Sequence, residues 1–148
     1  MDYKGIVHER LGEAPFVGAL ILANDCPYKC KGCFNQYLKT KPTLQNSAKE
    51  IIDMIKQNPF NEGVILGGLE WTYQPKDMLN LVNIAQANNL KVMIFTHMYK
   101  DEFLSKFPQL TNRNIIVKFG GYEEQNKIDD YYSNGTKLAT SNQYVEII

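Results

Sequence analysis

The chain has 148 residues, and its 16 Lys and Arg residues balance its 16 Asp and Glu residues, so the formal net charge is zero at pH 7. This length fits a single domain, residues 1–148, that can bury a core without disulfide bonds. The balanced charge, with no basic stripe, argues against nucleic acid or an anionic membrane as a partner. The longest apolar run, Val17–Ala23, is too short to span a bilayer, and no signal peptide is evident, so we expect a cytoplasmic protein.

The first half of the chain contains two predicted strands and one predicted helix. An aliphatic run, Phe16–Ala23, has the composition of a buried strand and is followed by a loop with three cysteines. A helix is expected from Ser47, because Glu50 three residues later completes a capping box, and this helix ends before Asn58. A second apolar run, Val64–Leu66, is predicted as another buried strand and leads into two glycines.

The second half continues this alternation of helix and strand, which is typical of a parallel βαβ fold. Pro75 fits the first turn of a helix whose apolar residues recur at helical spacing up to Asn88. Lys91–Thr96 is the clearest strand, a short helix over Asp101–Phe107 follows it, and Asn114–Phe119 is the fourth strand. The polar tail ends in YVEII, which is predicted as a last edge strand.

The residues that follow the predicted strands are expected to meet at one edge of the sheet. Ligands of parallel α/β sheets and barrels bind at the carboxyl ends of the strands. Here the successive strands end in the three cysteines, Gly67–Gly68, Thr96–His97 and Gly120–Gly121. A doubly wound sheet and an open, partial barrel both fit this pattern, and 148 residues are too few for the units of a full barrel.

Every cysteine of the chain lies in the segment CPYKCKGC, residues 26–33, with the spacing C-x3-C-x2-C. Three thiols in one short loop cannot form a disulfide framework, so they indicate a metal site or reactive thiols. A structural zinc site needs a fourth ligand, for which His8 and His97 are the candidates. One narrow loop can instead present its sulfurs to three irons of a cubane and leave the fourth iron open. The spacing favours an iron–sulfur cluster over zinc.

The cysteine loop resembles the cluster motif of radical S-adenosylmethionine enzymes, in which three cysteines hold a [4Fe–4S] cluster and the open iron binds the cofactor. KGCFNQ is similar to the GCYN version found in anaerobic ribonucleotide reductase activating proteins, which are among the shortest members. Further similar segments are VILGG, VMIFTHMYKDEFL and LATSNQYVEI. The departures from the family pattern include His97, which stands where the family has glycine, and the absence of the arginine of its C-terminal motif.

The resemblance implies a fold and a set of site residues. The fold would be α/β, a partial, open parallel (β/α) barrel of about four to five strands. Cys26, Cys30 and Cys33 would hold the cluster. The residues expected to bind S-adenosylmethionine are Gly32, Cys33, Phe34, Gly67, Gly68, Glu70 and Thr96. No side chain is assigned as a catalytic acid or base, because hydrogen abstraction by a radical requires no proton shuttle.

The resemblance also implies an anaerobic oxidoreductase. In that family the reduced cluster cleaves S-adenosylmethionine to methionine and a 5′-deoxyadenosyl radical. The radical would take a hydrogen atom from a glycine of a large anaerobic ribonucleotide reductase, with an electron donor such as flavodoxin, and the activase could form a homodimer. Two other hypotheses stay open: a radical enzyme that modifies a small molecule or peptide, and a non-catalytic metal-binding domain built on the three cysteines.

Overall fold

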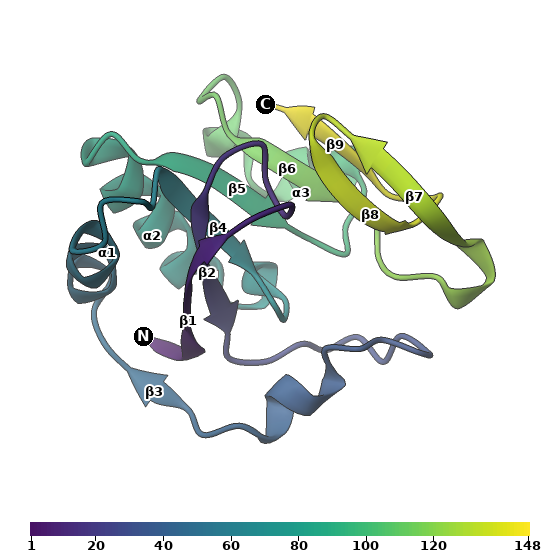
Figure 1. Ribbon diagram of the computed structural model, residues 1–148, viewed down its shortest axis with the longest axis horizontal. Coiled ribbons are helices and arrows are strands. Elements are labelled where there is room, and N and C mark those ends of the chain that lie inside the picture. The colour runs from purple at the N-terminus through teal and green to yellow at the C-terminus, as the bar shows by residue number, and fades with distance from the viewer.

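The computed structural model describes all 148 residues and contains a mixed seven-stranded sheet, three α-helices and a separate two-stranded hairpin (Figure 1). The strands of the large sheet are β1 (Asp2–Arg10), β2 (Gly18–Ala23), β3 (Leu44–Gln45), β4 (Gly63–Gly67), β5 (Lys91–Phe95), β6 (Ile116–Phe119) and β9 (Tyr144–Ile147). The helices are α1 (Ala48–Lys56), α2 (Pro75–Ala87) and α3 (Lys100–Lys106). The hairpin consists of β7 (Lys127–Ser133) and β8 (Thr136–Thr140).

The four predicted strands form the centre of the large sheet, whose order is β3-β1-β2-β4-β5-β6-β9. Neighbours among β2, β4, β5 and β6 run parallel, as the βαβ pattern predicted. However, β1 pairs antiparallel with β2, and β9 pairs antiparallel with β6. The prediction of a partial, open parallel (β/α) barrel is therefore wrong. Antiparallel strands occupy both hydrogen-bonding edges at which a further βα unit would have to continue a barrel, so the result is a mixed sheet.

The two faces of the sheet carry different layers. Side chains alternate between the faces, so on β4 Val64 and Leu66 face the helices and Ile65 faces the opposite side. A core of 27 buried residues lies mainly on the helical side, whereas a core of 6 lies on the other side. The smaller core includes Phe16 and Leu138 of β8, so the hairpin covers part of the second face (Figure 1). The rest of that face is available for a site.

The helices begin as their sequences predicted. Ser47 caps α1 by accepting a hydrogen bond of 3.1 Å from the backbone amide of Glu50, and the Glu50 carboxylate accepts one of 2.7 Å from the Ser47 amide. Pro75 occupies the first turn of α2. No helix in the protein has the length and hydrophobicity that crossing a membrane requires.

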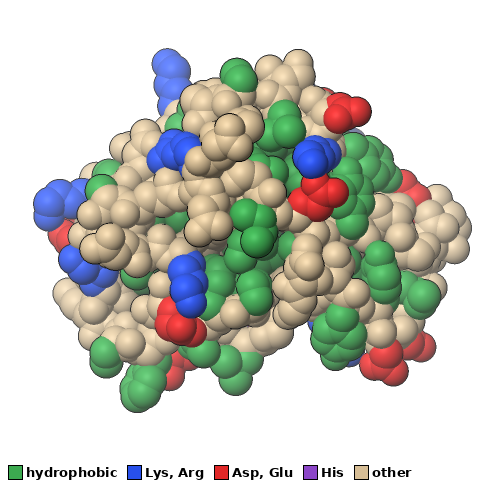
Figure 2. Space-filling model, turned by 90° about the horizontal axis from the view of Figure 1, so that it is seen from above, with side chains coloured by type: hydrophobic (Ala, Val, Ile, Leu, Met, Phe, Trp, Pro, Cys, Tyr) green, Lys and Arg blue, Asp and Glu red, His purple; other side chains and the backbone are tan.

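The hairpin was not predicted, although its turn has a sequence signal. Asn134 and Gly135 connect β7 to β8, and both have positive φ, 46° and 78°, as a tight type I′ turn requires. The Asn134 side chain donates a hydrogen bond of 2.6 Å to the Val145 carbonyl of β9, which joins the hairpin to the large sheet. Figure 2 shows that charged side chains of both signs are scattered over one face of the molecule, among patches of apolar side chains.

Candidate functional site

A pocket of about 450 Å³ lies on the sheet face away from the helices. Leu20, Phe95 and Lys118 line its base. Leu20 is in register with Ile65, which faces the smaller core, and Phe95 is in register with Lys118, so all belong to that same face. The cysteine loop forms one wall, and residues of β1 and β8 form the opposite side. The expected convergence of residues at the strand ends is therefore found in this pocket.

All three cysteines line the pocket, and all three are free thiols with intermediate exposure. The backbone amide of Cys33 donates a hydrogen bond of 3.2 Å to the Cys30 carbonyl, which closes a tight turn around Gly32. Gly32 has a φ of 76°, in the region that favours glycine. Burial raises the pKa of the Cys26 and Cys30 thiols. A positive group that binds the thiolates is therefore needed to hold these sulfurs deprotonated.

The arrangement of the thiols fits a cluster better than a single ion. No three His, Cys, Asp or Glu side chains are gathered closely enough to hold one metal ion. Zinc would require all its ligand atoms about 2.3 Å from one centre, whereas each cysteine of a cubane binds a different iron. Three separate sulfurs on the wall of one open pocket match a cubane, in which each cysteine binds a different iron. The donor set is thus suited to a [4Fe–4S] cluster with one iron that no cysteine binds.

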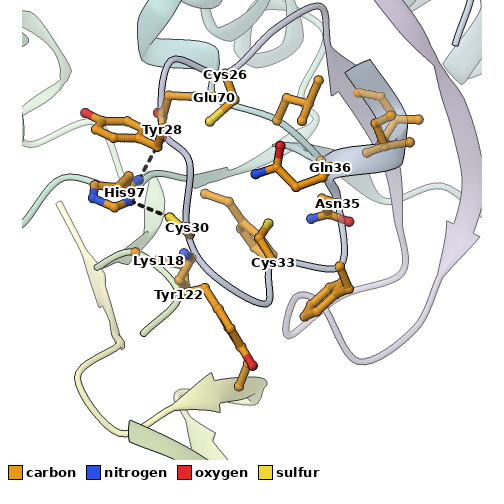
Figure 3. Close-up of a pocket in the computed structure, with 18 of the residues that line it drawn as sticks. Cys26, Tyr28, Cys30, Cys33, Asn35, Gln36, Glu70, His97, Lys118 and Tyr122 are labelled. Atoms are coloured by element: carbon orange, nitrogen blue, oxygen red, sulfur yellow. Dashed lines mark hydrogen bonds between the residues drawn. The ribbon is translucent and has the colours of Figure 1, made fainter. Parts of the chain in front are cut away.

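His97, at the end of β5, lies between the cysteine loop and the strand ends (Figure 3). Its Nδ1 is 3.7 Å from Cys30 Sγ, and its ring stacks on Tyr28 with 3.7 Å between ring centroids. On its other side is Gly121, where any Cβ atom would overlap the imidazole ring. Burial lowers the pKa of His97 and so favours the neutral imidazole.

Glu70 and Thr96, which were predicted to bind the cofactor, both line the pocket, but both are buried and bonded to their surroundings. Thr96 Oγ1 donates a hydrogen bond of 3.0 Å to Glu70 Oε1, and the His97 backbone amide donates one of 2.8 Å to Glu70 Oε2. Thr72 also donates to Glu70 Oε1 from its hydroxyl, over 2.6 Å. This carboxylate therefore ties the loop after β4 to the end of β5 and holds the shape of the pocket.

The remaining predicted residues fall into two groups, those that line the pocket and those that do not. Gly68 and Phe34 line the pocket, whereas Gly67 and Gly32 do not. Gly68 has a φ of 79°, and a Cβ there would lie 2.5 Å from Leu22 Cδ2, so the turn requires glycine. Phe34 is 67% exposed at the rim.

Lys118 is the main residue that the sequence reasoning missed. It lies on β6 beneath the pocket, and its Nζ donates hydrogen bonds of 2.9 Å to the Gly120 carbonyl and 3.4 Å to the Thr96 carbonyl. No carboxylate forms an ion pair with it. Burial lowers the pKa of Lys118 to about 8, while Glu70 and the cysteines act in the opposite direction. A lysine inside the apolar run IIVKF was the sequence signal for it.

Comparison with known proteins identifies the family. No curated protein and no solved structure matches this chain. A family model described as the 4Fe-4S single cluster domain matches residues 14–145, which include the cysteine loop, the four parallel strands and the hairpin. Three cysteines on one pocket wall agree with the single cluster in that description. The chain therefore belongs to the 4Fe-4S single cluster domain family.

Proposed function

We propose that this protein is a radical S-adenosylmethionine enzyme that generates a glycyl radical on an anaerobic ribonucleotide reductase. The observation that carries the proposal is the position of Cys26, Cys30 and Cys33 on one wall of a pocket whose base is made by strand ends and the Gly68 turn. A 4Fe-4S family whose member has only three cysteines leaves one iron open for a cofactor.

The pocket has the size and the charges that such a cofactor needs. Its volume of about 450 Å³ is within the range of small-molecule sites. S-adenosylmethionine carries an amino group and a carboxylate on its methionyl part. Glu70 and Lys118 are buried groups of opposite charge that line the same pocket without pairing with each other. Lys118, which has no carboxylate partner, is the natural counterion for the cofactor carboxylate.

The protein's part in the reaction is to bind, orient and exclude water. When bound and reduced, the cluster supplies the electron that splits the carbon–sulfur bond of S-adenosylmethionine and yields the 5′-deoxyadenosyl radical. The Gly68 turn lets the backbone approach the methionyl group, and Leu20 and Phe95 give the base of the pocket an apolar surface. An apolar surface would exclude water from the radical. The pocket would also position the target C–H bond close to the radical.

The exposed rim supports a protein substrate. Phe34 and Tyr37 both line the pocket, yet they are 67% and 58% exposed. A protein that docks on this rim would bury both aromatic rings and close the pocket against solvent. A glycine loop of a large reductase satisfies this need, with flavodoxin or a similar protein as the electron donor.

The test uses anaerobically reconstituted protein, reductant and S-adenosylmethionine. We expect 5′-deoxyadenosine by chromatography, and, after addition of the cognate reductase, a glycyl radical doublet by electron paramagnetic resonance. The doublet should collapse when the reductase glycine is deuterated at Cα, and the Cys30→Ala variant should form none. Cleavage without a radical on the reductase, together with modification of a small molecule or peptide, would replace the activase by a different radical enzyme. Absence of cleavage would leave a cluster-binding domain without this chemistry.

A further inference from the structure

The sulfur of Cys30 differs from the other two cysteine sulfurs in its surroundings. Its Sγ lies 3.7 Å from Nδ1 of His97, whereas no side chain is hydrogen-bonded to the sulfur of Cys26 or Cys33. Burial raises the pKa of the Cys30 thiol, and the backbone of Tyr122 acts in the opposite direction. The loops after β5 and β6 therefore both lie next to Cys30.

His97 is fixed in this position by three independent contacts. Tyr28 stacks on one face of the imidazole with an interplanar angle of 13°. The His97 backbone amide donates to the buried Glu70 carboxylate over 2.8 Å. Gly121 leaves just enough space for the ring, since any side chain at that position would collide with it. The stack on Tyr28 and the hydrogen bond to Glu70 therefore hold the ring beside the sulfur.

The chemistry of the two groups decides the direction of the hydrogen bond. A cysteine bound to iron is a thiolate, which can only accept, and a neutral imidazole carries one N–H. No protein group is hydrogen-bonded to Nε2 of His97, so no contact within the protein favours a proton on that nitrogen. With a thiolate at Cys30, the favoured tautomer has its proton on Nδ1, facing the sulfur.

We infer that His97 donates an Nδ1–H hydrogen bond to the sulfur of Cys30 and thereby makes the bound cluster easier to reduce. Reduction adds negative charge to the cluster and its sulfurs, and a hydrogen bond to a ligating sulfur stabilises that charge. His97 acts on the cluster through Cys30, as a positioning residue. The inference rests on cluster binding at Cys30 and is independent of S-adenosylmethionine, so it can fail or hold separately from the proposed activity.

Three substitutions at His97 separate the hydrogen bond from the bulk of the ring. Asparagine places an amide N–H at the position of Nδ1, glutamine places one at the position of Nε2, and phenylalanine keeps an aromatic ring to stack on Tyr28 but has no donor. The control is His8→Phe, because His8 lies on β1, is bonded to Asn61 and does not line the pocket.

The measurement is the midpoint potential of the reconstituted cluster, without S-adenosylmethionine, followed by electron paramagnetic resonance and normalised to iron content. We expect His97→Phe and His97→Gln to lower the equilibrium constant for one-electron reduction about tenfold, a shift of about 59 mV to more negative potential. His97→Asn should stay closer to wild type than His97→Gln, and His8→Phe should match wild type. If His97→Phe does not load a cluster, the asparagine and glutamine pair decides. Equal potentials for that pair, or a wild-type potential in His97→Phe, would overturn the inference.

Discussion

The carboxylate of Glu70 accepts a hydrogen bond of 2.8 Å from the backbone amide of His97, which lies 27 residues later in the chain. The same carboxylate accepts from the hydroxyls of Thr72 and Thr96. One buried acid thus connects the loop after β4 with the loop after β5, and it holds the backbone from which the His97 ring reaches Cys30.

The hydrogen bonds of Glu70 should be visible in the stability of the protein. Glutamine at this position has one acceptor oxygen instead of two and would leave at least one buried donor unpaired. We expect Glu70→Gln to lower the free energy of unfolding by about 1–3 kcal/mol in denaturant titrations. Glu102→Gln, which removes an exposed pair with Lys106 on α3, should cost no more than about 0.5 kcal/mol. Equal losses in the free energy of unfolding would show that the hydrogen bonds of Glu70 do not stabilise the fold.

Lys118 should give the stability a specific pH dependence. Burial lowers its pKa in the folded protein to about 8, from 10.5. Below about pH 8 the amine is charged in both the folded and the unfolded state. The folded state then bears the full free-energy cost of burying this charge. Between about pH 8 and 10.5 only the unfolded state keeps the proton, so the folded state gains up to about 3 kcal/mol as pH rises.

The Lys118→Met variant lacks this titration and serves as the reference. We expect the free energy of unfolding of the wild type, minus that of Lys118→Met, to increase across this pH range. Both metal-free proteins are unfolded with denaturant. The contributions of all other titrating groups then cancel in the difference between the two. If the difference in the free energy of unfolding stays constant from pH 8 to 10.5, burial does not lower the pKa of Lys118 in the folded protein.

Each cysteine should be required for the cluster and not for the fold. Reconstituted wild-type protein is expected to contain about four irons and four acid-labile sulfides per chain. Changing Cys26, Cys30 or Cys33 to serine should abolish the intact cluster, while circular dichroism stays unchanged because none of the cysteines is a fully buried core residue. Stoichiometric zinc without labile sulfide in the wild type would contradict cluster binding.

The Gly68 turn can be tested against a matched glycine. Gly68 and Gly12 both have positive φ, 79° and 90°, so alanine strains the backbone at either position by roughly 1–2 kcal/mol. Only at Gly68 does the new Cβ meet other atoms, Leu22 Cδ2 at 2.5 Å, and only Gly68 lines the pocket. We expect Gly68→Ala to weaken S-adenosylmethionine binding at least about tenfold in equilibrium dialysis, and Gly12→Ala to leave it unchanged. Equal affinities of the two variants for S-adenosylmethionine would show that the cofactor does not bind at the Gly68 turn.

The parallel centre of the fold could be predicted because its signals are local. The capping box at Ser47, the proline at the start of α2 and the short aliphatic runs each depend on neighbouring residues only. β1 could not be found in this way. Its register shifts on either side of Gly5–Val7, and the positive φ of Glu9, break the alternation that marks a strand.

The candidate site was predictable in its cysteines but not in its surroundings. The pocket brings together groups that are far apart in sequence, such as Cys30 and His97, 67 residues apart. The burial of Glu70 and Lys118 follows from the packing of loops after separate strands, which spacing along the chain does not reveal. The hairpin, by contrast, was missed although Asn134–Gly135 is a recognisable turn signal between two polar strands.

Of the 27 residues of the larger core, only Leu22, Leu38 and Leu69 line the pocket that holds the cysteines. Most of the apolar burial that stabilises the fold therefore lies away from the cluster site, where oxygen and iron chemistry act. A cluster destroyed by exposure to air should leave an intact polypeptide with three thiols still on the wall of the same pocket. Repair then requires only new iron, sulfide and reductant, and the same molecule can return to service without being synthesised again.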